Sequence, residues 1–136
     1  MKISTKTRYG LRAMAYLTKK NDYASVKEIS DNEEIPYDYL EKIFNRLKTA
    51  NLVKVKLGAQ GGYRLAKPAK KITAGGIIRA IEETLVPVMC VVKEGDKIIS
   101  CKRSKSCVAK KIWLIIQHSL ADTLEKISLA DLVKSN

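Results

Sequence analysis

The sequence is poor in the residues that most enzyme active sites require. It contains one histidine, His118, and no combination of serine, histidine and acidic residues that would form a catalytic set. Its glycine-rich stretch, GAQGGYRLAK, lacks the Lys-Ser/Thr ending and the strand-to-helix setting of a phosphate-binding loop. These absences disfavour catalysis and nucleotide binding.

Long apolar runs are also missing. No apolar stretch approaches the length that crosses a bilayer, and none follows the opening MKISTKTRYG. We therefore expect neither a signal peptide nor a membrane span, and a cytoplasmic location. The 136 residues, 46% of them hydrophobic, suit one compact domain with at most one protruding element.

Cysteine is scarce, and all three cysteines lie within residues 90–107, CVVKEGDKIISCKRSKSC. An odd number of thiols in a reducing compartment argues against a disulfide framework and leaves metal binding, thiol chemistry or inert packing. Zinc is disfavoured because four protein ligands at regular spacing are missing. Lys102, Arg103 and Lys105 lie among the thiols, and their positive charge favours thiolates.

Positive charge is what the chain has in excess, with a formal net charge of +12 from 26 Lys and Arg against 14 Asp and Glu. Residues 1–71 hold 16 of these cations and 7 of the acids, whereas residues 72–136 hold 10 and 7. A basic half-chain is typical of a protein that binds a phosphate backbone. A membrane surface or an acidic partner would be served equally well.

Three helices are predicted in the basic half. Apolar spacing indicates a helix over residues 5–20. Ser25 and Glu28 open a short second helix as a capping box. A third helix begins near Pro36 and carries one apolar face, which predicts that its other face is polar and exposed.

A hairpin follows, because the apolar period changes from helical to two. Val53, Val55 and Leu57 alternate with lysines, and the glycine loop leads into a return strand through Tyr63. Three helices and a hairpin predict a winged helix-turn-helix domain over residues 1–71, in which the third helix enters the DNA major groove. RNA or protein contact is the alternative use of this basic surface. The candidate DNA-binding residues are Tyr37, Glu41, Lys42 and Asn45 on the third helix and Lys54, Lys56 and Arg64 on the wing.

The rest of the chain is predicted to hold a linker helix over residues 72–85, a cysteine-containing sensor loop over residues 86–106, and a dimerisation helix with a last short helix capped by Ser128 over residues 107–136. One small domain does not easily cover the apolar stripe of the long helix, so we expect a homodimer on a palindromic operator. The predicted fold class is mainly α with a small β-hairpin. The stripe consists of Ala109, Ile112, Trp113, Ile116, Leu120, Leu124 and Ile127.

Five segments match the pattern of one known family: MKISTKTRYGLRAM, YLEKIFNRLKTANLVK, GAQGGYRLAK, ITAGGIIRAIE and the cysteine loop that ends shortly before IW. Together they resemble the IscR-type winged-helix transcription regulators, a group that includes nitric-oxide and cysteine-metabolism regulators. The resemblance implies a homodimeric bacterial transcription factor, commonly a repressor, whose operator binding is tuned by an iron–sulfur cluster. It also implies that Glu41 and Lys42 read bases. The implied cluster ligands are Cys90, Cys101 and Cys107, and a two-iron two-sulfur cluster is favoured over a four-iron four-sulfur one.

The chain departs from the family pattern in the wing and in the cysteine spacing. Leu57 stands where the wing usually carries an arginine before its first glycine. Lys54, Lys56 or Arg64 would then supply part of that contact, because phosphate pairing tolerates position better than base reading does. The gap between the first two cysteines is longer than in the best-known members, which a loop tolerates at little entropic cost.

The fourth ligand of the implied cluster is open. Lys110 stands where some relatives place a histidine, and Arg8 where others place an acidic residue. His118 lies eleven residues past Cys107, about 16 Å along a helix, which is too far to close the same site. The candidates are Glu94, Asp96, a residue of the partner subunit or a small exogenous ligand. The alternative function is a cluster-free regulator of the same fold that acts through thiol oxidation or by binding a partner protein.

Overall fold

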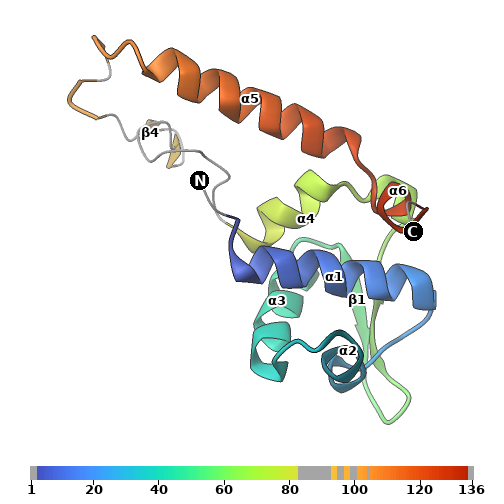
Figure 1. Cartoon of the computed structure of the whole chain (residues 1–136). Coiled ribbons are helices and arrows are strands. Elements are labelled where there is room, and N and C mark those ends of the chain that lie inside the picture. Colours follow the sequence, from blue (N-terminus) through green and yellow to red (C-terminus); the bar gives the residue numbers. More distant parts are fainter. Residues whose placement is uncertain (1–2, 83–92, 95–96, 99–100, 104, 135–136) are drawn as a thin grey trace.

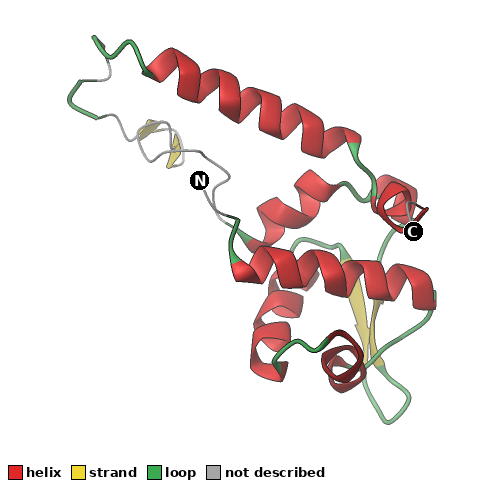
Figure 2. Cartoon of the chain, viewed as in Figure 1, coloured by secondary structure: helices red, strands yellow, loops and turns green. Residues whose placement is uncertain are grey.

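The computed structural model describes residues 3–82, 93–94, 97–98, 101–103 and 105–134 (Figure 1). Three helices precede an antiparallel hairpin, and a long helix lies near the C-terminal end (Figure 2). This arrangement confirms the predicted fold class, mainly α with a small β-hairpin. The elements are α1 (Thr5–Lys20), α2 (Val26–Glu33), α3 (Tyr37–Thr49), β1 (Val53–Lys56), β2 (Gly62–Leu65), the 3-10 turn η1 (Ala69–Lys71), α4 (Ala74–Ile81), β3 (Lys93–Glu94), β4 (Lys97–Ile98), α5 (Lys110–Lys126) and α6 (Leu129–Lys134).

The start of α2 follows its sequence signal, with one difference. The Ser25 hydroxyl accepts the N–H of Glu28 at 3.0 Å, which is the predicted cap. The Glu28 carboxylate, the other half of the predicted capping box, accepts from the Tyr16 hydroxyl at 3.0 Å and from the Lys20 ammonium. Burial and this hydrogen bond raise the pKa of Tyr16. The acidic residue therefore joins α2 to α1.

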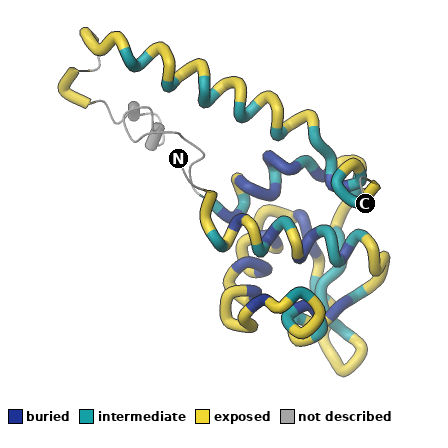
Figure 3. The backbone as a smooth tube through the Cα atoms, in the orientation of Figure 1, coloured by how far each residue is buried: buried dark blue, intermediate teal, exposed yellow. Residues whose placement is uncertain are grey.

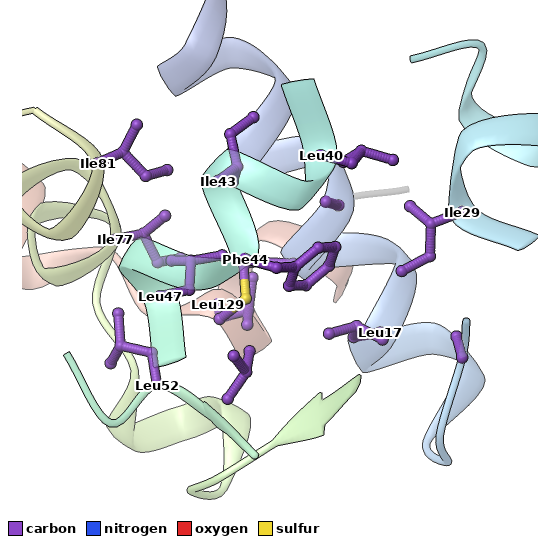
Figure 4. Close-up of a cluster of buried hydrophobic side chains, with 14 of the residues drawn as sticks. Leu17, Ile29, Leu40, Ile43, Phe44, Leu47, Leu52, Ile77, Ile81 and Leu129 are labelled. Carbon is purple, nitrogen blue, oxygen red and sulfur yellow. The ribbon is translucent and has the colours of Figure 1, made fainter. Parts of the chain in front are cut away.

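The hydrophobic core lies where α1, α3 and α4 meet (Figure 4). Helix α3 contributes most of it, because its apolar residues fall on a single stripe. The fully buried side chains include Leu17 of α1, Leu40, Ile43, Phe44 and Leu47 of α3, and Ile77 of α4.

The C-terminal end of the chain returns to this core. Leu129 of α6 is fully buried, and its N–H donates to the Ile72 carbonyl at 2.7 Å. The N–H of Ala74 donates to the Ile127 carbonyl at 2.8 Å, which joins the start of α4 to the end of α5. The predicted cap Ser128 accepts a backbone N–H three residues later at 3.1 Å. Helix α6, the predicted last short helix, thus packs against α1 and the turn η1.

Tyr63 of β2 docks the wing on the helices. Its ring stacks on Phe44 with centroids 4.5 Å apart, and its backbone exchanges hydrogen bonds with Ala24 at 2.8 and 2.9 Å. The expectation that Leu57 extends the apolar face of the strand is wrong. Strand β1 ends at Lys56, the chain turns away, and Leu57 is 88% exposed in the hairpin loop.

Helix α5 extends away from the rest of the molecule, and none of its 17 residues, all of which the structure describes, is buried (Figure 3). Its C-terminal end is tied to α4 by an ion pair between Arg79 and Glu125. Near its N-terminal end Val108, Ile112 and Ile115 are 84%, 55% and 63% exposed. An apolar surface is therefore left uncovered on the described part of the chain. No described helix, α5 included, is long and apolar enough to span a membrane.

Candidate nucleic-acid interface

Helix α3 presents a polar face to solvent because Leu40, Ile43, Phe44 and Leu47 all point into the core. Lys42 and Asn45 lie opposite the buried stripe, while Tyr37 and Glu41 lie on the flank toward the wing. All four candidate DNA-binding residues of this helix are exposed, as the sequence pattern predicts: Tyr37, Glu41, Lys42 and Asn45.

Tyr63 brings the wing into electrostatic range of α3. Burial raises the pKa of the Tyr63 hydroxyl, and the neighbouring Glu41 and Tyr37 add to the shift. The ring of Tyr63 also stacks on Phe44, on the buried side of the same helix. The N-terminal half of α3 is thereby held at a fixed distance from β2.

The three candidate cations of the wing share one face of the hairpin. Lys54 and Lys56 alternate along β1, and Arg64 stands directly opposite Lys54 in the antiparallel register. The Tyr23 ring lies 5.7 Å from the Lys56 ammonium and 5.9 Å from the Arg64 guanidinium. Cation–aromatic contacts at these distances help to orient both side chains.

An open cleft of about 390 Å³ separates this face of the wing from the C-terminal end of α1. Among the described residues that line it, Lys54, Arg64 and Lys67 are cations and none is acidic. Thr18 and Asn21 of the opposite wall add polar groups. The cleft therefore has the charge and polarity that suit a phosphate group.

The two groups of candidates point in different directions. Successive residues of a strand face opposite sides, so Arg64 points away from the side on which Tyr63 packs against α3. The structure thus places Tyr37 and Glu41 beside Tyr63, and Lys54, Lys56 and Arg64 on the outer face of the hairpin. Contacts with a curved ligand, such as a DNA duplex, would use both surfaces.

Two residues of this outer surface were not among the sequence candidates. Lys67 lies within the GAQGGYRLAK segment. Its positive charge, close to Arg64 in the sequence, could have identified it as a further phosphate-binding candidate. Tyr23 lies between α1 and α2, where no periodicity marks it, and only the bridge between Ala24 and Tyr63 brings it to the wing.

The cysteines are only partly covered by the structure. Cys90 lies outside the described residues, as does Asp96. Cys101 and Cys107 are free and exposed. Within the described residues, no group of three or more histidine, cysteine or acidic side chains is placed to share a metal ion. The exposed thiols fit an iron–sulfur cluster in ligand type, since such clusters are held by thiolates.

The sequence profile of the Rrf2 family, described as an iron-dependent transcriptional regulator, matches residues 3–135 of this chain. The chain belongs to the Rrf2 family. It is 33% identical to the HTH-type transcriptional regulator IscR of Vibrio campbellii over 100% of this chain and 79% of that one.

Two solved structures share the fold of this Rrf2 protein along its length. CymR, the global cysteine regulator of B. subtilis, is 35% identical, covers 100% of this chain and 98% of its own, and gives a TM-score of 0.78. The IscR of T. potens is 34% identical, covers 99% of this chain and 88% of its own, and gives a TM-score of 0.77. The expectation of a DNA-binding transcription regulator that is not an enzyme is confirmed by these relatives.

Proposed function

We propose that this Rrf2 regulator binds a palindromic operator as a homodimer, with α3 in the major groove and the wing along the adjacent backbone. The observation that carries the proposal is the exposed polar face of α3, held rigidly by the four buried side chains beneath it. A recognition helix, the helix that contacts base edges and is called the reading helix below, must be held rigidly by the core beneath it. A small displacement of the helix removes its hydrogen bonds to the base edges.

In this proposal the exposed residues of α3 and those of the wing contact different parts of the DNA. Glu41 and Lys42 contact base edges, Asn45 extends that contact toward the C-terminal end of α3, and Tyr37 contacts the backbone near its start. Leu57 has no donor for a phosphate, so the wing cations Lys54, Lys56 and Arg64 bind the backbone. The cleft beside Arg64 receives one of these phosphates.

Lys42→Ala and Arg64→Ala are expected to weaken operator binding in different ways. Loss of a base contact costs about 1–3 kcal/mol, roughly 5-fold to 150-fold in affinity, and relaxes sequence preference at one position. Loss of a phosphate contact weakens binding to all sequences alike and lowers the slope of log affinity against log salt by about one. Fluorescence anisotropy at several salt concentrations, with an operator selected from a random duplex library, measures both.

Lys126→Ala is the matched control, since Lys126 is an exposed cation at the far end of α5. It should leave both affinity and salt slope nearly unchanged. Equal effects of all three substitutions would contradict the assigned interface and indicate only general attraction of a basic protein to DNA.

The homodimer rests on α5. An apolar patch that stays exposed on one chain marks an interaction surface, and a twofold pair of long helices would present two reading helices to two half-sites. Val108, Ile112 and Ile115 form this patch.

We further propose that Cys90, Cys101 and Cys107 hold an iron–sulfur cluster, two-iron two-sulfur in preference to four-iron four-sulfur, with a fourth ligand from outside this set. When bound, the cluster supplies a redox-sensitive and labile group whose gain or loss is the signal. The chain supplies thiolates, and Lys102, Arg103 and Lys105 balance the negative charge of the site. We further propose that operator binding by this regulator represses transcription, as is common in the family that it resembles.

Thiol oxidation without a cluster is the second candidate. The exposure of both described cysteines and the likeness to CymR support thiol oxidation as well as they support a cluster. In that case peroxide or a similar oxidant acts directly on the exposed thiols.

Cys101→Ala is expected to abolish visible absorbance and bound iron in protein purified without oxygen, while helical content and melting temperature stay unchanged because Cys101 is exposed. Wild-type protein should contain equal iron and sulfide. Ser106→Ala, a neighbouring exposed position, is the control and should keep the cluster. A colourless wild-type protein that reconstitution does not repair would transfer the proposal to the thiol mechanism.

A further inference from the structure

The end of α4 that leads into the cysteine segment is held by two other helices. Glu82 directly follows α4, and Cys90 comes eight positions later. Residues 81 and 82 are thus the last described point of the chain before the first candidate ligand. What they contact determines what a change in the cysteine segment can reach.

Glu82 binds the first turn of α1. Its Oε1 accepts the N–H of Ser4 at 3.3 Å, the Ser4 hydroxyl at 2.5 Å and the Thr7 hydroxyl at 2.5 Å. Thr7 is fully buried, so the carboxylate satisfies a hydroxyl that has no access to water. The Ser4 oxygen in turn accepts the N–H of Thr7 at 3.2 Å and caps α1.

Charge strengthens this contact at neutral pH. Partial burial acts to raise the pKa of Glu82, but the hydrogen bonds from Ser4 and Thr7 outweigh it and lower the pKa. A carboxylate with a lowered pKa contributes stability above its ordinary pKa and loses it only as the pH falls through the lowered value. The negative charge also lies at a helix N-terminus, where the helix dipole favours it.

Arg46 binds the same end of α4 from the reading helix. Its Nη1 donates to the carbonyl of Ile81 at 2.8 Å, one of the last carbonyls of α4, which have no partner within the helix. Arg46 also borders an open hollow of about 320 Å³ between α3 and α4. At this edge the two helices are therefore joined by the arginine rather than by close packing.

The side chain of Ile81 completes the junction. It is 2% exposed, and a Cβ placed on Gly10 of α1 would lie 2.1 Å from its Cδ1 atom. The absence of a side chain at Gly10 lets α4 approach α1 closely. Residue 82 therefore cannot move far without disturbing α1 through Glu82 or α3 through Arg46.

We propose that this junction couples the cysteine segment to the reading helix, with Glu82 and Arg46 as positioning residues. The inference rests on the proposed function, because it assigns the route by which cysteine chemistry changes operator affinity. In one state both hydrogen-bond sets hold α1 and α3 in the DNA-binding arrangement. In the other state a displacement at residue 82 breaks them and lets α3 shift against the wing.

Arg46 acts in this scheme through α4 and not through a base. Although it is exposed on the reading helix, it lies on the flank toward α4, about 100° from the direction of Asn45. Its substitution should therefore change how operator affinity responds to the cysteines, in addition to any change in the affinity itself.

The test measures operator affinity in two states of the cysteines. One sample is purified without oxygen, and the other is treated with a chelator and then with iodoacetamide, which removes any cluster and blocks the thiols. In wild-type protein the ratio of the two dissociation constants should be about tenfold or more in either direction, within the usual range of allosteric coupling. Glu82→Ala and Arg46→Ala should bring the ratio to within about twofold of one.

Conservative variants and a control separate coupling from loss of structure. Glu82→Gln and Arg46→Lys keep an acceptor or a donor at each position and should retain part of the ratio. Arg12→Ala removes a guanidinium that donates to the Glu33 carbonyl elsewhere in the same domain, and should leave the ratio unchanged. Melting curves of every variant confirm that each sample is folded.

The outcomes distinguish the junction from the function on which it rests. A large wild-type ratio that persists in folded Glu82→Ala and Arg46→Ala overturns the junction alone. A wild-type ratio of one overturns both, because the cysteines then do not control DNA binding. Loss of the ratio in these two variants, with Arg12→Ala like wild type, supports the junction.

Discussion

Gly62→Ala is expected to abolish operator binding and to lower the free energy of unfolding by about 3–5 kcal/mol, which is in the range of the most damaging single substitutions. Gly62 has φ +143°, a region that residues with a side chain rarely adopt. A Cβ there would lie 2.2 Å from the carbonyl oxygen of Ala24 and 2.7 Å from the nitrogen of Ser25. Both atoms are backbone, so no rotation of a side chain relieves the clash.

The effect reaches DNA binding through Tyr63, the next residue. Its two hydrogen bonds with Ala24 and its stack on Phe44 hold the wing to α3. Separating β2 from Ala24 breaks these contacts and releases the wing cations from their positions.

Gly58→Ala is the matched control, because Gly58 also has a positive φ, +107°, but a Cβ there meets nothing within 4 Å. It should cost only backbone strain, about 1 kcal/mol. Urea denaturation followed by circular dichroism, together with anisotropy, measures both variants. A Gly62→Ala protein as stable as Gly58→Ala would show that the wing does not dock in this way.

Local signals in the sequence were sufficient for the elements that carry the interface. Apolar periodicity predicted the bounds of α1 and the polar face of α3, because both depend on residues within one or two turns. The alternation of β1 also predicted that Lys54 and Lys56 share a face.

What that face packs against could not be predicted from alternation. The direction of the wing cations depends on the contact between Tyr63 and Phe44, 19 positions apart in the sequence. The hydrogen bond from the Ser4 hydroxyl to the Glu82 carboxylate joins residues 78 positions apart, and no local sequence pattern predicts so distant a partner. Leu57 shows the complementary error, since a period of two does not indicate where a strand ends.

The apolar residues of α5 show the same limit. One stripe over residues 109–127 was predicted to pair with a second copy, and several of its members, such as Trp113 and Leu120, are half-buried on the single chain. The most exposed apolar side chains of this segment, Val108 and Ile115, lie outside the predicted stripe. Ile112, a member of the stripe, lies beside them. Periodicity identified the helix as apolar but not the part of it that stays uncovered.

Ile115→Glu should therefore convert a dimer into monomers and sharply reduce operator affinity, without unfolding the chain. Ile115 is 63% exposed on the single chain, and glutamate is a good helix former, so the stability of the monomer should change little. In a twofold dimer the substitution places two buried charges in an apolar interface. It should cost about 3 kcal/mol or more, roughly 100-fold in the dimer dissociation constant.

Operator affinity should fall with the dimer, because a monomer binds each half-site separately and loses the effective concentration that links the two heads. Sedimentation equilibrium and anisotropy on the same samples test whether the two losses occur together. Thr123→Glu adds the same charge at an exposed position near the end of α5 that Glu125 ties to α4, and should remain dimeric. If Ile115→Glu stays dimeric, a different surface joins the two chains. If wild type is monomeric at the concentrations that bind DNA, the exposed patch on α5 has another partner. The proposal that a homodimer binds a palindromic operator is then wrong.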